Sequence, residues 1–235
     1  MQDFGQAIVL ALHLVLAGNA DLMEIVGLSL KVSLTAVFAS CLIGLPLGAV
    51  LAISSFRGRG IVLVLLNALM GLPPVVVGLI VYLFLSNAGP LGWLRLLYSP
   101  AAMIIAQAVL ITPIIAALSR QVIEELHDEY AEQFRSLCVS LPSAVAALIW
   151  DGRYSLVTVA LAGFGRAVAE VGAVMIVGGN IDHLTRVMTT AIALETSKGD
   201  LALALGLGMV LMVMALVINA AVMALRLTAA RFAYA

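Results

Sequence analysis

The chain has 235 residues, of which 63% are hydrophobic and 11% charged, and its formal net charge is −1. A soluble domain carries about 25% charged residues, so this chain has too little polar surface to cover a globule in water. A net charge near zero also provides no field that would attract nucleic acid. The composition predicts an all-α integral membrane protein that is surrounded by a lipid bilayer and has no nucleic-acid partner.

The first apolar stretch, residues 4–17, is shorter than the roughly 20 residues that an ordinary transmembrane helix needs. We expect a helix lying in the membrane interface, within an N-terminal outer segment of residues 1–24. A shortened sixth span is the alternative. Residues 25–235 are expected to form one transmembrane domain.

The later apolar segments are long enough to cross a membrane. Four of them contain no charged residue: Val32–Phe56, Ile61–Leu85, Pro100–Ser119 and Leu201–Leu225. A fifth, Ser155–Gly179, is equally apolar except for Arg166 and Glu170. The sequence therefore predicts about five transmembrane helices.

Prolines interrupt the apolar pattern of the first two spans. Proline removes a hydrogen bond from a helix and clashes with the preceding turn. We therefore predict helix kinks or breaks at Pro46, Pro73 and Pro74. Such breaks either shape the packing against neighbouring helices or give flexibility beside a pathway.

The basic residues predict the orientation, because short loops rich in lysine and arginine stay in the cytoplasm. With the N-terminus outside and five crossings, the cytoplasmic segments hold seven basic residues and the outer segments four. This distribution predicts a C-terminus in the cytoplasm and a location in the inner, or cytoplasmic, membrane.

The largest polar insertion, residues 120–153, is expected on the cytoplasmic side. Five acidic residues lie on a helix that continues from the third span, and a short apolar helix, Ser143–Ile149, follows. Ser140 is suited to cap this second helix, and Pro142 is tolerated in its first turn. The insertion is either a docking element for another protein or a solvated loop between two spans.

One pair of opposite charges lies within a predicted span. Arg166 is about 16 Å into the fifth segment, and Glu170 follows one helical turn later. A charge near the bilayer centre costs at least about 2.5–3.5 kcal/mol, so it faces protein or water. The pair is either a structural ion pair or part of a passage for an anion. Gly178, Gly179 and Asn180 are expected to end this helix, with Asn180 beside the same passage.

The chain contains no phosphate-binding loop, zinc-protease motif or nucleophile elbow. We therefore expect no enzyme activity, no metal site and no cofactor in this chain. Uphill transport would need an ion gradient or a separate ATPase that binds ATP and Mg²⁺.

The segment Glu132–Ser140 resembles the EAA loop of ABC importer permeases, although Gln133, Phe134 and Cys138 depart from its pattern. Other segments resemble permeases of the molybdate and tungstate type, and their sequences are most similar to the tungstate branch. These segments are Gly71–Gly78, Ser86–Gly92, Gly163–Ala173 and Gly178–Ile181.

The resemblance implies a type I ABC importer permease fold and a homodimer with a pathway along its two-fold axis. It also implies cytoplasmic ABC ATPase subunits and an extracytoplasmic oxyanion-binding protein as partners, with tungstate or molybdate as the transported anion. The residues expected to couple to the ATPase are Glu132, Arg135, Cys138, Ser140, Pro142, Ser143 and Ala144. A secondary transporter or channel without an ATPase partner is the alternative.

Overall fold

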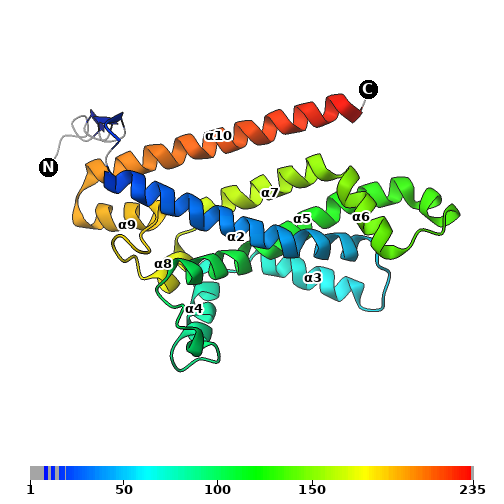
Figure 1. Cartoon of the computed structure of the whole chain (residues 1–235), viewed down its shortest axis with the longest axis horizontal. Helices are drawn as coiled ribbons and strands as arrows, with labels where there is room; N and C mark the ends of the chain where they lie inside the picture. The colour runs from blue at the N-terminus through cyan, green and yellow to red at the C-terminus, as the bar shows by residue number, and fades with distance from the viewer. Residues whose placement is uncertain (1–7, 10–11, 14–15, 19, 234–235) are drawn as a thin grey trace. The chain divides into compact units, whose positions relative to one another are not determined.

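The computed structural model describes residues 8–9, 12–13, 16–18 and 20–233, and Figure 1 follows them from the N-terminus to the C-terminus. Within these ranges the regular elements are helices. The interfacial helix predicted for residues 4–17 falls largely on residues outside the described ranges, as does much of the segment 1–24.

The elements follow the predicted apolar segments in chain order. They are α2 (Ala20–Ile53), α3 (Arg59–Met70), α4 (Pro74–Leu85), the 3₁₀ helix η1 (Gly92–Leu94), α5 (Pro100–Ser136), α6 (Leu141–Asp151), α7 (Arg153–Val168), α8 (Gly172–Gly178), α9 (Met188–Lys198) and α10 (Leu201–Ala233). In the described part of the chain, three helices are each long and apolar enough to cross a membrane, namely α2, α5 and α10. The number rises to five if each of two bent pairs, α3 with α4 and α6 with α7, counts as one span. The prediction of about five spans agrees with this result.

The first span begins earlier than predicted, at Ala20 and not at Val32. Asp21 lies in the first turn of α2, where a negative charge interacts favourably with the helix dipole. Glu24 and Lys31 follow in the same helix, so the uncharged stretch begins only at Val32 and the predicted boundary was wrong.

Pro46 and Pro73 have different effects on the backbone. Pro46 lies inside α2, which continues past it without a break, so a kink at this position stays a prediction. At the second site the break is confirmed, because α3 ends at Met70 and α4 begins at Pro74 with Pro73 as its N-cap residue. Proline fits the first turn of a helix, where its missing N–H group costs nothing. The segment Ile61–Leu85 is therefore two helices and not one.

The chain divides into two compact units. The first unit contains residues 1–36, 73–107 and 165–219, and the second contains residues 37–72, 108–164 and 220–235. The long helices α2, α5, α7 and α10 each contribute a part to both units.

In the first unit, α4 packs closely against α8 (Figure 1). A Cβ atom at Gly78 would lie 2.7 Å from the Cα atom of Ala173, so only glycine permits this distance. Small residues at helix contacts are typical of membrane proteins, in which close van der Waals packing drives association.

In the second unit, glycines of α2 bring it close to α5. A Cβ atom at Gly48 would lie 2.5 Å from the carbonyl oxygen of Ala116, and the Ser119 hydroxyl donates to the carbonyl of Gly44 at 3.3 Å. Gly44 and Gly48 therefore allow α2 to pack closely against α5. A buried core in this unit joins α2, α5, α6 and α7 through Ala49, Ala52, Ile123, Leu148 and Leu156.

Many large apolar side chains of the spans lie exposed on the surface, among them Phe38, Leu42, Val64 and Leu216. An apolar surface of this extent is stable only when lipid or another protein covers it. The exposure agrees with the membrane location that the composition predicts.

Candidate functional site

The fifth predicted span is interrupted where its two charges lie. Helix α7 ends at Val168, and α8 begins at Gly172 and has seven residues. The prediction that Glu170 continues the helix of Arg166 is therefore wrong, because Glu170 lies in the break between α7 and α8.

The ion pair itself is confirmed. Arg166 Nη1 lies 2.5 Å from Glu170 Oε2, and Glu170 Oε1 accepts a hydrogen bond from the backbone N–H of Ala173 at 3.2 Å. The carboxylate thus bonds both to the last turn of α7 and to the first turn of α8. A buried carboxylate is stable only with such partners.

The two side chains of the pair differ in their access to solvent. The Glu170 side chain is 4% exposed, whereas that of Arg166 is 37% exposed. A guanidinium has five N–H donors, and the carboxylate of Glu170 uses only part of this capacity. Arg166 can therefore donate to a further anion while Glu170 holds it in place.

Asn180 follows the end of α8, as predicted. Gly179 and Asn180 both have left-handed backbone conformations, with φ values of 70° and 50°. The Asn180 Nδ2 group donates to the carbonyl of Thr190 in α9 at 3.4 Å. The side chain thus contacts α9, and the hydrogen bonds of the Arg166–Glu170 pair do not include it.

The predicted EAA-like loop begins at the end of α5. Cys138 has a left-handed φ of 48°, its N–H donates to the carbonyl of Arg135 at 3.2 Å, and the N–H of Val139 donates to the carbonyl of Phe134 at 3.0 Å. These two bonds form the Schellman ending of a helix, in which glycine is the usual left-handed residue. Cys138 keeps the backbone of the turn although it replaces the glycine of the EAA pattern.

Helix α6 is longer than predicted, because it runs from Leu141 to Asp151. Pro142 lies in the first turn, as expected. Ser140 occupies the N-cap position but makes no capping bond with a backbone N–H group, so that prediction is wrong. Its hydroxyl lies 2.9 Å from the Ser143 hydroxyl, which replaces the backbone as hydrogen-bond partner.

The predicted coupling residues divide into two groups. Ala144 is buried, with 4% of its surface exposed, so it supports the packing of α6 and does not face a partner. The others lie at the surface: Glu132, Arg135, Cys138, Ser140, Pro142 and Ser143.

The exposed face of α6 also includes Ala146, Ala147 and Trp150. Trp150, which the sequence reasoning missed, is 71% exposed, and the Arg153 guanidinium lies 5.0 Å from its ring centroid. Its helical spacing from Ser143 and Ala147 could have indicated this face. We call the six exposed residues of the loop together with Ala146, Ala147 and Trp150 the coupling surface.

A polar network supports the coupling surface from within the second unit. The Arg59 guanidinium donates to the carbonyl of Leu51 at 3.0 Å and to Glu124 Oε1 at 2.7 Å, so it joins the end of α2 to α5. Arg120 also pairs with Glu124. The Tyr130 hydroxyl donates to Asp151 Oδ2 at 2.9 Å and joins α5 to α6. No local pattern predicts these contacts, since Arg59 and Glu124 are 65 residues apart.

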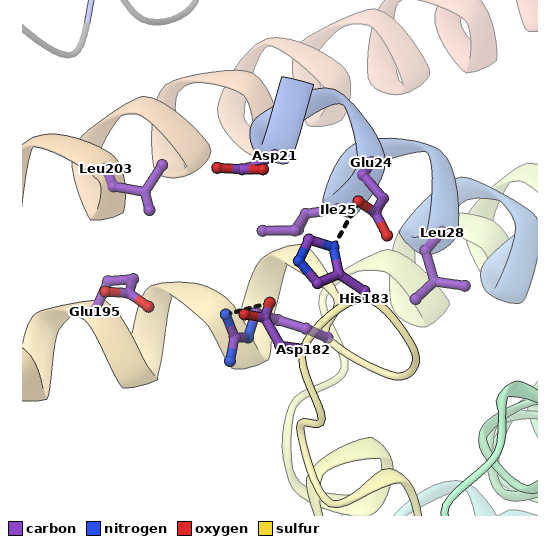
Figure 2. A pocket seen from close by; sticks show the side chains of 9 residues that line it. Asp21, Glu24, Ile25, Leu28, Asp182, His183, Glu195 and Leu203 are labelled. Carbon is purple, nitrogen blue, oxygen red and sulfur yellow. Dashed lines mark hydrogen bonds and ion pairs between the residues drawn. The ribbon is translucent and has the colours of Figure 1, made fainter. Parts of the chain in front are cut away.

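A second polar cluster lies in the first unit, around a pocket that residues of α2, the loop before α9, α9 and the start of α10 line. Figure 2 shows Glu24 of α2 facing His183 of that loop, with 2.9 Å between Oε2 and Nδ1. The hydrogen bond with Glu24 raises the pKa of His183, and the charges of Glu24 and Asp182 add to this effect. Arg186 pairs with Asp182 at 2.6 Å. No group of residues suited to hold a metal ion is present in the described part of the chain.

No protein-family model matches the chain. Over 226 residues it is 37% identical to the tungstate uptake system permease protein TupB of Peptoclostridium acidaminophilum, an alignment that covers 96% of this chain and 99% of that protein. A probable anion ABC transporter permease protein of Haloferax volcanii is 37% identical over 204 residues, with 85% of this chain and 88% of the relative covered. The chain belongs to the permease subunits of ABC transporters.

The permease is therefore a multi-pass membrane protein and not itself an enzyme. Its family membership excludes the alternative of a secondary transporter or channel that works without an ATPase. A more distant relative is the sulfate transport system permease protein CysW of Synechocystis, which is 28% identical over 215 residues that cover 85% of this chain and 75% of that protein.

Proposed function

We propose that the permease is the membrane subunit of an importer for tungstate. The observation that carries this proposal is the alignment with a protein named for tungstate uptake over 96% of this chain and 99% of the relative. A second protein of that name, from Campylobacter jejuni, is 38% identical over 164 residues, and the alignment covers 70% of this chain and 69% of that protein.

In this proposal two copies of the permease form a homodimer in the cytoplasmic membrane, with the N-terminus outside and the C-terminus in the cytoplasm. An oxyanion-binding protein delivers the anion at the outer side. Two ATPase subunits, which bind ATP and Mg²⁺, dock on the coupling surface. The exposed turn at Cys138 and the exposed face of α6 support this docking, since a neighbouring protein can reach both.

Arg166 is proposed to line the passage of the anion. Its guanidinium can donate to the oxygens of a tetrahedral dianion, and it is the more exposed member of its ion pair. Glu170 repels the anion and keeps its binding at Arg166 weak. A transport site needs this balance, because binding must be strong enough for entry and weak enough for release.

A competition experiment tests the choice of anion. The permease is reconstituted in vesicles with its ATPase and binding protein, and uptake of radiolabelled tungstate is measured in the presence of unlabelled tungstate, molybdate or sulfate. We expect unlabelled tungstate to reduce the uptake far more than sulfate does. Sulfate that competes as well as tungstate would contradict the proposed substrate.

A further inference from the structure

The break between α7 and α8 leaves backbone carbonyl groups that a continuous helix would have bonded. The carbonyl of Ala167 accepts from the N–H of Glu170 at 3.2 Å and from Gln107 Nε2 of α5 at 3.0 Å. The carbonyl of Glu170 accepts from the Thr189 hydroxyl of α9 at 2.8 Å. Two side chains from other helices therefore stabilise the break, as a polar backbone within a membrane requires.

A glutamine at position 107 is not the side chain that would make the fold most stable. It is 3% exposed, and its Oε1 atom is buried without a hydrogen-bond partner in the described structure. A buried acceptor without a partner destabilises a protein, whereas an apolar side chain of similar size at that position does not. The amide at this position thus points to a role beyond packing.

The side chains that hold the break surround one small cavity. Gln107, Glu170 and Thr189 line it together with Ser29 and Ser33 of α2. Ser29 also accepts a hydrogen bond from the backbone N–H of Met188 at 2.7 Å, which fixes the start of α9 beside Thr189. The position of Thr189, and through it that of Glu170, therefore depends on the contact of α9 with α2.

We propose that Gln107 and Thr189 are positioning residues that keep α7 and α8 separate and thereby hold Arg166 and Glu170 in their transport geometry. This inference rests on the proposed role of Arg166 in the anion passage. Without the Gln107 amide, the carbonyl of Ala167 can bond with the N–H of Val171, as in a continuous helix. Without the Thr189 hydroxyl, the carbonyl of Glu170 loses its bond with α9. The Glu170 carboxylate then leaves the N–H of Ala173, and Arg166 loses its orientation.

Matched variants separate positioning from packing. Thr189→Val keeps the shape of the side chain and removes the hydroxyl, whereas Thr189→Ser keeps the hydroxyl. Thr190→Val is the control, because Thr190 is buried on the same helix and bonds only with Val187 at the start of α9 through its hydroxyl. Gln107→Leu removes the Nε2 donor together with the Oε1 acceptor that has no hydrogen-bond partner.

The variants are measured in vesicles that contain the permease with its ATPase and binding protein. We record KM and maximal rate of tungstate uptake, together with thermal unfolding and assembly. Thr189→Val and Gln107→Leu should lower the maximal rate about three- to tenfold, the effect of losing one interhelical hydrogen bond. Thr189→Ser should restore the rate, and Gln107→Leu should unfold at no lower temperature than the unmodified permease.

A double variant links the effect to Arg166. If Gln107 acts through Arg166, then Gln107→Leu added to Arg166→Ala should reduce uptake no further than Arg166→Ala alone. Equal rates for Thr189→Val and Thr190→Val, or a loss of uptake that only follows a loss of assembly, would overturn the positioning role. If Arg166→Ala still reduces uptake, either of these results would leave the proposed function intact. Normal uptake in Arg166→Ala would instead overturn the passage at Arg166 and the positioning role with it.

Discussion

Replacing Cys138 by glycine should stabilise the permease, because Cys138 has a left-handed φ of 48° at the end of α5. A residue with a Cβ atom loses about 1–2 kcal/mol in this conformation, whereas glycine adopts it without that cost. Glycine also has more freedom in the unfolded chain, which offsets about 0.4–1 kcal/mol of the gain. The net stabilisation expected from these two effects is about 1 kcal/mol.

For a chain of this length, about 1 kcal/mol corresponds to an increase of roughly 2–4 °C in the unfolding temperature. Thermal unfolding of the purified permease, followed by the fluorescence of Trp93 and Trp150, measures this shift. Cys138→Ala is the matched control, because it also removes the thiol but keeps the Cβ atom, so its unfolding temperature should not rise. A lower unfolding temperature for Cys138→Gly, or equal shifts for the two variants, would refute the strained turn.

Three further predictions concern the core, the coupling surface and the outer cluster. Leu148→Ala should destabilise the permease by about 2–5 kcal/mol in chemical unfolding, because Leu148 is 0% exposed in the core below α6; a loss under about 1 kcal/mol would contradict this packing. Trp150→Ala should leave the unfolding temperature unchanged and reduce stimulation of the partner ATPase, and full stimulation would remove Trp150 from the coupling surface. The pair of His183 and Glu24 should stabilise the fold fully below the ordinary histidine pKa of about 6.5 and lose this effect as the pH rises through the raised pKa of His183. The difference in unfolding temperature between the unmodified permease and Glu24→Gln, measured from about pH 5 to about pH 9, should therefore shrink as the pH rises; a difference that grows would contradict the pairing.

The sequence predicts those features that depend on composition and on neighbouring residues. Apolar length alone indicates about five spans, and the charged continuation of α5 is confirmed because it keeps a helical pattern up to Ser136. The break at Pro73 is also local, since proline excludes a continuous helix there.

The features that the sequence does not predict depend on distant residues. The break after Val168 contains no proline, and it is stabilised by Gln107, 60 residues from its partner, and by Thr189, 19 residues from its partner. The close packing of α2 against α5 around Pro46 also depends on distant residues, since Gly48 faces Ala116 and Ser119 bonds with Gly44. Ala144 was among the residues expected to couple to the ATPase because the sequence does not determine the rotation of α6 about its axis. That rotation depends on the core that α6 contacts.

We propose that the permease transports its anion only when an ATPase drives it through the coupling surface. The most direct measurement is tungstate accumulation in vesicles that contain the permease with its ATPase and binding protein, compared with vesicles that contain the permease alone. We predict accumulation against the gradient in the complete system when ATP is supplied, and none with the permease alone. Accumulation by the permease alone, or equal accumulation with and without ATP, would contradict the claim.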